Sequence, residues 1–365
     1  MKFVIALLLT SVAAPALSLP LDSLNLPDGY SIEVYAEVPN ARQMAQGPDG
    51  VIYVGTRRDG RVFAVVDHND DYEADEVIEL DADLNLPSGV TYKNGDLYVG
   101  AVSEILVYEN IDKQLASPPE PIVLIGDLPT ERHHGWKFID FGPDGHLYVP
   151  VGAPCNICLS DDPRYASIIR YDLEDLTKPE IVANGVRNTV GFDWHPKTGH
   201  LWFTDNGRDN LGDESPACEL NELQEPGQHF GYPFFHADGI SDPEFAAKAN
   251  KAQSYIEPAL NLGPHVAPLG ILFYTGSMLP GLSNQVLIAE HGSWNRTPEA
   301  GHTGYRVTVG REDSGEMFYE VLIDGWLEDS NEAWGRPVDF LQLKDGSVLL
   351  SDDKANVIYR MTYSK

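Results

Sequence analysis

Arginine and histidine side chains gather in a few short segments of a chain that is otherwise strongly acidic. The 365 residues include 25 lysines and arginines against 56 aspartates and glutamates, and the formal net charge is −31. Guanidinium groups bind carboxylates, and imidazole transfers protons near neutral pH. If the fold brings the segments together, they form a pocket for a multiply charged anion, with one or more histidines for proton transfer. The basic segments are Asn40-Ala41-Arg42, Thr56-Arg57-Arg58, His133-His134-Gly135, Arg187-Asn188, Asn206-Gly207-Arg208-Asp209, His265, the run from His291 to Arg296, Gly335-Arg336 and Asp352-Asp353-Lys354.

A simpler interpretation applies to several of these residues. Arg42, Arg57, Arg58 and Lys354 could each pair with a nearby acid, and His133 could be a packing group. The strands and turns around these segments decide between the two interpretations, because they determine whether the segments meet.

Those elements are predicted by a repeated hairpin. Gly47-Pro48-Asp49-Gly50 precedes the apolar run 51–55, and Gly142-Pro143-Asp144-Gly145 precedes the run 146–149. Weaker copies of the turn occur near residues 94, 198, 284 and 345, and an apolar run precedes each turn. A strand, a tight turn and a second strand form a hairpin, and six hairpins at roughly even spacing indicate a radial repeat.

Further apolar runs supply a third strand in each repeat and a fourth in most of them, for example 104–108 and 121–125. Six repeats of four antiparallel strands predict an all-β, six-bladed β-propeller over residues 19–365. The wider spacing after the fourth turn predicts an insertion at about 224–268. The strand at 30–35 could close the ring against the first or the last blade.

A propeller places the basic segments on one face. The leading loop of a blade runs into its first strand, and the trailing loop leaves its second strand. Both lie at the face opposite the Gly-Pro-Asp-Gly turns, because strand direction alternates. The leading loops contain His134, Arg187 and Arg336, which we therefore expect around one axis.

The N-terminus predicts export. Residues 1–18 combine Lys2, an apolar run at 4–9 and small residues up to Ser18, as in a secretory signal peptide. The apolar run is too short to cross a bilayer, and no later segment could do so. We therefore expect a periplasmic or secreted protein, and the net charge argues against nucleic acid as a partner.

Three cysteines fit an oxidising compartment. Cys155 and Cys158 form a Cys-x-x-Cys for which a local disulfide is expected, since no second Cys or His pair follows to complete a metal site. A thioredoxin-like redox role would need a different surrounding fold. Cys218 is left over and is expected to be buried or free.

Longer motifs resemble a known family. His134-Gly135-Trp136-Lys137-Phe138 running into the turn at 142, Gly185-Val186-Arg187-Asn188, and the run from Thr204 to Asp209 resemble the soluble aldose sugar dehydrogenases that depend on pyrroloquinoline quinone (PQQ). The runs 152–158 and 289–296 are more similar to the L-sorbosone dehydrogenase branch. The resemblance covers most of the chain after residue 18.

The resemblance implies PQQ and Ca²⁺ in an axial cleft. It implies oxidation of a sugar hydroxyl or a hydrated aldehyde, with electrons passed to an external acceptor such as a quinone or cytochrome. His134, eight residues before Gly142, matches the general base, and Arg187 matches the arginine over the quinone carbonyls. The remaining matched residues are Asn188 for the cofactor, Arg336 for a cofactor carboxylate, and Gly207 and Arg208 for Ca²⁺ through their backbone carbonyls.

The sequence departs from the glucose-oxidising members at two positions. Ala153 stands where they have an aspartate near the base, and Val338 stands where they have a second cofactor arginine. Lys137, His265 or Arg296 could bind the cofactor carboxylates instead. The departures leave the identity of the sugar or aldehyde open.

Two further questions stay open at this point. An acidic stretch could hold another Ca²⁺ ion or could be an acidic surface loop; it contains Asp205, Asp209, Asp213, Glu214, Glu219 and Asn221. A Ca²⁺-dependent, lactonase-like hydrolase is an alternative function, although it needs carboxylates and asparagines around the axis. A non-catalytic binding propeller is the third, since fold alone does not settle function.

Overall fold

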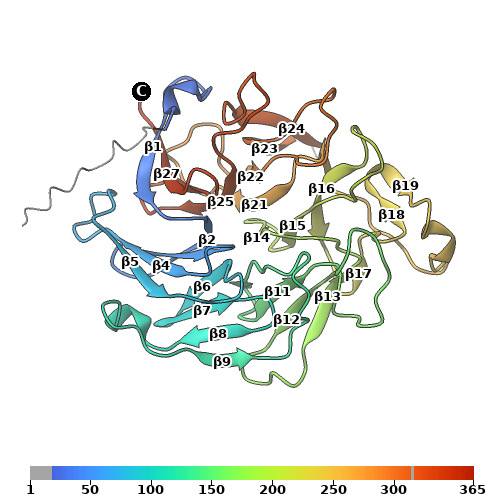
Figure 1. Cartoon of the computed structure of the whole chain (residues 1–365), viewed down its shortest axis with the longest axis horizontal. Coiled ribbons are helices and arrows are strands. Elements are labelled where there is room, and N and C mark those ends of the chain that lie inside the picture. The colour runs from blue at the N-terminus through green and yellow to red at the C-terminus, as the bar shows by residue number, and fades with distance from the viewer. Residues whose placement is uncertain (1–18, 314–315) are drawn as a thin grey trace, which may run out of the picture.

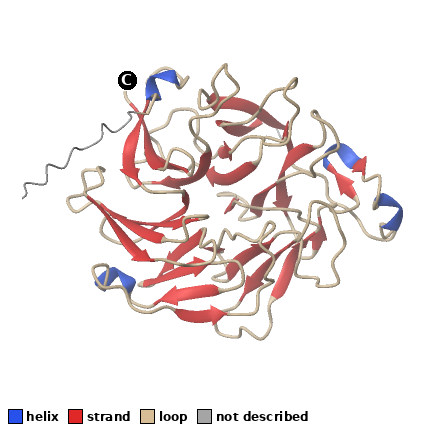
Figure 2. Cartoon of the chain, in the orientation of Figure 1, coloured by secondary structure: helices blue, strands red, loops and turns tan. Residues whose placement is uncertain are grey.

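The computed structural model describes residues 19–313 and 316–365, and it consists almost entirely of β-strands and loops (Figure 2). Six sheets surround a central axis, with the innermost strands near the centre of the ring (Figure 1). The all-β class and the six-bladed propeller are confirmed. The expected signal peptide, residues 1–18, lies outside the described residues. No helix in the described ranges is long and apolar enough to span a membrane.

Each blade has four strands, numbered outward from the axis in chain order except at ring closure. The first three blades are β2 (Ala41–Gln46), β3 (Val51–Thr56), β4 (Val62–Val66) and β5 (Glu76–Asp81); β6 (Gly89–Lys93), β7 (Asp96–Gly100), β8 (Ile105–Tyr108) and β9 (Ile122–Ile125); and β10 (Asp140–Phe141), β11 (Leu147–Val151), β12 (Ser167–Tyr171) and β13 (Glu180–Asn184). The others are β14 (Phe192–Trp194), β15 (Leu201–Asp205), β16 (Ala217–Leu223) and β20 (Leu260–Pro264); β21 (Pro268–Phe273), β22 (Val286–Glu290), β23 (Arg306–Asp313) and β24 (Glu316–Ile323); and β25 (Pro337–Gln342), β26 (Val348–Asp352), β27 (Val357–Tyr363) and β1 (Tyr30–Glu37).

The ring closes in the sixth blade. Strand β1 pairs antiparallel with β27, with Tyr30 opposite Tyr363 and Glu37 opposite Val357. The first blade has its own outer strand, β5, so it needs no help from β1. Of the two closures that the sequence allowed, the structure therefore adopts the one against the last blade.

The fourth blade carries a long excursion between its third and fourth strands, β16 and β20 (yellow in Figure 1). It contains β17 (Gln228–His229), which pairs parallel with β13 of the third blade, and the small hairpin of β18 (Phe235–His236) and β19 (Ile240–Ser241). The insertion expected at about 224–268 thus includes β20, which is the outer strand of the blade itself. Short 3-10 helices complete the structure: η1 (Leu21–Ser23), η2 (Ile111–Lys113), η3 (Ala237–Gly239) and η4 (Ala246–Lys248).

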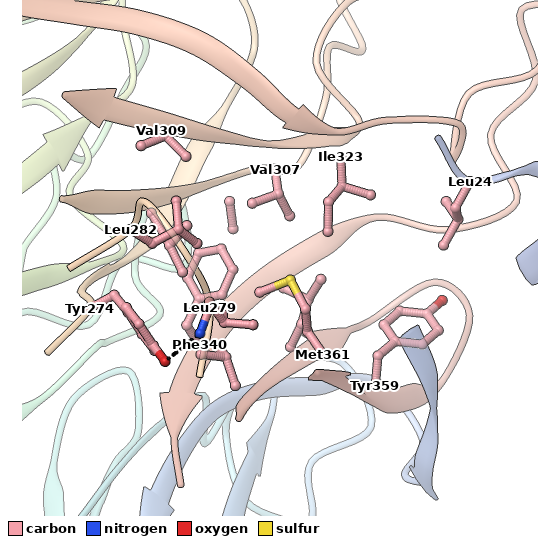
Figure 3. Close-up of a cluster of buried hydrophobic side chains, with 14 of the residues drawn as sticks. Leu24, Tyr274, Leu279, Leu282, Val307, Val309, Ile323, Phe340, Tyr359 and Met361 are labelled. Carbon is pink, nitrogen blue, oxygen red and sulfur yellow. Dashed lines mark hydrogen bonds between the residues drawn. The ribbon is translucent and has the colours of Figure 1, made fainter. Parts of the chain in front are cut away.

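The apolar core lies between the blades. Six clusters of buried side chains each join one blade to the next around the ring. In the cluster between the fifth and sixth blades, Val307 and Ile323 face Phe340 and Met361 (Figure 3). Blade-to-blade burial of this kind fixes the angular position of every leading and trailing loop.

Polar side chains on the innermost strands add a second tie between neighbours. Asp339 on β25 accepts a hydrogen bond from the backbone N–H of Met44 on β2, at 2.9 Å. Asp193 on β14 accepts one from the N–H of Phe273 on β21, at 2.7 Å. Burial raises the pKa of each of these carboxyls to about 7. The inner strands are therefore joined by buried acids as well as by apolar packing.

Candidate active site

A cavity of about 600 Å³ opens at the axis, on the face opposite the Gly-Pro-Asp-Gly turns. The leading and trailing loops of several blades supply its wall, as expected from the strand directions. Its lining residues are Arg42, Arg57, Arg58, Arg132, His133, His134, Trp136, Arg187, Asn188, Asn206, Gly207, Asp209, Cys218, His265, Ala267, Leu269, His291, Gly292, Trp294, Asn295 and Arg336.

The lining is strongly cationic. Six arginines and four histidines face the cavity, and in the described part of the chain Asp209 is the one carboxylate among the lining residues. The whole chain, in contrast, has a net charge of −31. A cavity with these walls suits an anionic ligand, because low-dielectric walls strengthen the field of the lining charges.

His134 is held in a single tautomer. Its Nδ1 lies 2.9 Å from the carbonyl oxygen of Ala153. A carbonyl can only accept, so Nδ1 carries the proton and Nε2 keeps a lone pair. Burial and the cation of Arg187 lower the pKa of His134 well below its usual value. The imidazole is therefore neutral and able to accept a proton.

The close approach of His134 to the neighbouring loop requires a glycine. A Cβ atom at Gly152 would lie 2.5 Å from the Cβ atom of His134, closer than real Cβ contacts allow. Gly152 directly precedes Ala153, the partner of the imidazole. Ala153 itself has no carboxylate to offer, so the imidazole of His134 is oriented by a backbone carbonyl.

Arg187 is clamped from three sides. Its guanidinium donates to the carbonyl oxygen of Asn156 at 2.9 Å, to the Asn156 side-chain oxygen at 2.9 Å, to the carbonyl oxygen of Asn206 at 2.9 Å and to Asp209 at 3.0 Å. The buried carboxylate of Asp205 accepts its backbone N–H at 2.7 Å. Few rotamers are compatible with so many contacts, so the guanidinium has one fixed place in the wall.

The loop around Asn156 is closed by the Cys155–Cys158 disulfide, and this expectation from the sequence is confirmed. The hydroxyl of Tyr232 accepts the N–H of Cys158 at 3.0 Å, which ties the loop to the insertion. Cys218 is buried and free, and it also lines the cavity.

Arg336 presents an uncompensated charge. Its guanidinium donates to the carbonyl oxygens of His291 and Gly292, at 2.8 and 2.6 Å. Burial lowers its pKa from the usual arginine value. Neutral carbonyls do not cancel the charge, so this arginine can bind a ligand carboxylate.

A second histidine in the wall joins a network that contains one ion pair; burial lowers the pKa of His291 to about 4, so its imidazole takes part as a neutral hydrogen-bonding group. The Nε2 atom of His291 lies 2.7 Å from Asp353, whose other oxygen is 2.9 Å from Arg42. Burial alone would raise the pKa of Asp353, but His291 and Arg42 together hold it well below its usual range. Arg42 thus pairs with an acid, as the simpler interpretation of the sequence suggested, while still lining the cavity.

Not every predicted residue reaches the cavity. His134, Arg187, Asn188, Gly207, His265 and Arg336 line it together. Lys137 does not line it: the side chain is fully buried, and its amine donates to the carbonyl oxygen of Gly135 at 2.7 Å. Arg296 turns away to the carbonyl oxygens of Gly301 and Asp213. The side chain of Arg208 pairs with Asp242 and Glu244.

The carbonyl oxygens of Gly207 and Arg208 remain available to a cation. Within the described ranges, neither oxygen accepts a hydrogen bond. Hard oxygen ligands of this kind suit Ca²⁺. Ca²⁺ takes roughly six to eight oxygen ligands, so these two carbonyl oxygens could supply only part of a site at the position that the sequence indicated.

The acidic stretch does not gather into one site. Asp209 pairs with Arg187, Glu214 pairs with Arg296, and Asp213 accepts the N–H of Thr297 at 2.8 Å. Burial and the neighbouring Asp205 raise the pKa of Glu219 to about 8. No group of three or more His, Cys, Asp or Glu side chains in the described residues could hold a metal ion.

Sequence reasoning missed parts of the wall. Arg132, Trp136 and Trp294 line the cavity but were not among the predicted site residues. Arg132 and Trp136 flank the predicted His134, and Trp294 lies in the basic run 291–296, so proximity in sequence was the available signal. Val338, one of the two departures, packs with Val190 and Leu269 in a small apolar cluster.

Comparisons with known proteins agree with the fold. The family described as TrAA12-like matches residues 24–364. A protein of Borreliella burgdorferi is 33% identical over 357 residues, covering 94% of this chain and 92% of that one. A Trichoderma reesei structure of Carbohydrate-Active Enzymes Family AA12 aligns with a TM-score of 0.79 and 18% identity, covering 96% of this chain and 100% of that one. The PQQ domain of pyranose dehydrogenase from Coprinopsis cinerea, in its holo form, aligns with a TM-score of 0.76 and 16% identity, covering 93% of this chain and 97% of that one.

At such identities the two solved structures establish the fold, whereas the family model spans nearly the whole described chain. The chain therefore belongs to the TrAA12-like family of PQQ-dependent oxidoreductases.

Proposed function

We propose that the protein oxidises an aldose or a sugar-derived aldehyde, such as a sorbosone-like compound, with PQQ as cofactor and His134 as the general base. The observation that carries the proposal is the convergence of His134, Arg187 and Arg336 on one cavity from three separate blades. Fixed cations and one neutral, oriented imidazole are the groups that such an oxidation needs.

The lining residues fit the cofactor. Arg336 and Arg187 offer guanidinium donors to carboxylate and carbonyl oxygens, and Asn188 and His265 lie in the same wall. Ca²⁺ would bind at the carbonyl oxygens of Gly207 and Arg208 and would polarise its ligand as a Lewis acid. When bound, PQQ would supply the two-electron oxidant that accepts hydride.

The chain's own residues would do the remaining work. The Nε2 lone pair of His134 would accept the hydroxyl proton of the substrate, while Nδ1 stays bonded to Ala153. Arg187, fixed by Asn156 and Asp209, would stabilise negative charge that develops on oxygen. An external electron acceptor, a quinone or a cytochrome, would complete the cycle.

The proposed location is the periplasm or the exterior of the cell. The signal-like residues 1–18 support it, and so does the Cys155–Cys158 disulfide, since disulfides persist in oxidising compartments. The lactonase alternative receives no support, because Asp209, the one lining carboxylate in the part of the chain that the structure describes, already pairs with Arg187.

The test is reconstitution of the apoprotein with PQQ and Ca²⁺, followed by absorbance and by dye reduction over a panel of aldoses and aldehydes. We expect cofactor binding at micromolar concentration, and its absence would contradict the proposal. His134→Ala should keep cofactor binding and lose roughly 10²–10⁴-fold in turnover, the usual contribution of a general base. His68→Ala is the matched control, since His68 lies on an exposed turn beside Glu76.

A further inference from the structure

Four arginines of the cavity have no ion-pair partner in the described residues: Arg336, which donates to carbonyl oxygens, and three others. Arg42 pairs with Asp353 and Arg187 with Asp209. In contrast, no carboxylate of residues 19–313 and 316–365 forms an ion pair with the guanidinium of Arg57, Arg58 or Arg132, although acids outnumber bases more than twofold in the chain. These three side chains are called the mouth arginines below, and no carboxylate of the described residues neutralises their positive charge.

Arg57 is a partly buried cation that lies among other cations. Its guanidinium lies over the Trp136 ring at 3.7 Å, and its buried Nε has no hydrogen-bond acceptor in the described structure. Burial, aided by the cations of Arg42, Arg58 and Arg336, lowers the pKa of Arg57 to about 9. A ligand anion at this position would offset both the repulsion and the lost hydration.

Two of the mouth arginines differ in depth from the buried cations of the wall, whereas Arg57 is half-buried, as Arg336 is. Arg42 and Arg187 are buried, with 2% and 4% of their surface exposed, and both are engaged with acids inside the wall. Arg58 and Arg132 are exposed at the solvent side of the same cavity. On the proposed function, the deeper cations face the cofactor, and a substrate that enters from solvent meets the mouth arginines.

An aromatic platform lies in the same lining. Trp294 is 70% exposed, the highest value among the large hydrophobic side chains that are exposed in the described chain. A flat indole face suits the apolar face of a pyranose ring, and the neighbouring Asn295 offers amide contacts. The mouth thus combines a surface for a sugar ring with donors for an anion.

We propose that the substrate is an anionic sugar, an aldose that carries a carboxylate as in a uronic acid. Its carboxylate is held by Arg57, Arg58 and Arg132, and its ring lies against Trp294. This inference rests on the proposed function and specifies its substrate class.

The charge distribution gives the inference a kinetic consequence. A protein with a net charge of −31 repels an anion at long range. The cationic mouth overcomes that repulsion only within about a Debye length, ~10 Å at 0.1 M salt. Oxidation of a uronate should therefore depend strongly on ionic strength, and oxidation of the neutral sugar should not.

The experiment compares matched pairs on the holoenzyme, galacturonate with galactose and glucuronate with glucose. We expect kcat/KM to favour the uronate by about tenfold or more, the effect of one charge-assisted hydrogen bond. Raised salt should shrink this preference. Arg58→Gln combined with Arg132→Gln should abolish it, whereas Arg170→Gln, a blade arginine paired with Asp144 and Glu180, should not.

Two outcomes would overturn the inference. One is equal kcat/KM for uronate and aldose in the wild-type enzyme. The other is a double variant that loses PQQ affinity in an absorbance titration while keeping the uronate preference, because the arginines would then serve the cofactor.

A calorimetric titration separates this inference from the proposed function. Galacturonate and galactose are titrated into the protein without PQQ. Tighter binding of galacturonate that is lost in the variant with Arg58→Gln and Arg132→Gln supports the anion site even if reconstitution fails, whereas equal binding of the two sugars, or a preference that survives in the variant, counts against it.

Discussion

Replacement of Asn156 by alanine should impair the reaction without unfolding the blade. The side-chain oxygen of Asn156 accepts from Arg187 and from the backbone N–H of Asp209, each at 2.9 Å, and its amide donates to the carbonyl oxygen of Asp209 at 3.2 Å. Alanine removes all three contacts. The carbonyl oxygen of residue 156 still accepts from Arg187, so the guanidinium loosens but is not released.

The size of the effect follows from these contacts. One lost bond to a charged group is worth about 1.5–3 kcal/mol, and each neutral bond is worth about 0.5–1.5 kcal/mol. Water can replace part of the loss, because Asn156 is only partly buried. The net cost of the lost contacts is roughly 2–3 kcal/mol, and this is an upper limit on the loss of transition-state stabilisation, so kcat/KM should fall by at most roughly 30–150-fold.

The assay separates positioning from binding. Arg187 is proposed to stabilise charge that forms during the reaction, so the loss should appear mainly in kcat, with KM and the PQQ titration little changed. Asn156→Asp keeps both acceptor contacts but places a second carboxylate against Arg187, so it should hold the guanidinium in place and recover only part of the rate. If Asn156→Ala retains kcat within about twofold of wild type, the clamp on Arg187 does not matter for catalysis.

Three further predictions concern protons and calcium. Since the pKa of His134 lies well below its usual ~6.5, turnover should stay level through that pH and fall only in more acidic buffer; an inflection above 6.5 would contradict the neutral base. Burial raises the pKa of Asp193, Asp339 and Glu290 to about 7, so between about pH 4 and 7 each of these three carboxyls holds a proton in the folded state that it loses in the unfolded chain. The stability that these three carboxyls contribute should therefore fall as pH rises through that window, so the calorimetric Tm of Asp339→Asn should gain on that of the wild type between pH 5 and pH 8; a relative loss over that range would refute it. Chelation of Ca²⁺ should weaken PQQ binding in an absorbance titration, and readdition of Ca²⁺ should restore it. An unchanged titration would show that the metal is not part of the cofactor site.

The ring and its orientation could be predicted from the sequence because both depend on short-range signals. A turn with glycine after aspartate specifies a hairpin: Asp49 and Gly50 both adopt positive φ, at 52° and 76°. Once the turns mark one face, His134, Arg187 and Arg336 must share the other. Their convergence follows from topology and needs no knowledge of side-chain direction.

Side-chain direction is what the sequence could not give. Arg296 lies in a trailing loop, yet its long side chain turns to Asp213 and Gly301, which fold beside it. Lys137 follows His134 by three residues but is buried, and its amine bonds to Gly135. The stacking of Arg57 on Trp136 joins two blades that are distant in sequence, so no local pattern in either segment predicts it.

The closing strand pair has a consequence for how the molecule is made. Strand β1 is among the first elements to be synthesised, and its partner β27 is the last strand of the ring. During translation β1 has no partner strand until the five other blades and most of the sixth have been synthesised. Its contacts with β27 span more than three hundred residues, and such long-range closure is slow. A nascent chain that stops before β27 would leave the edges of both β1 and β26 open to pairing with other chains, so the final step of synthesis protects the molecule from misassembly as well as completing its shape.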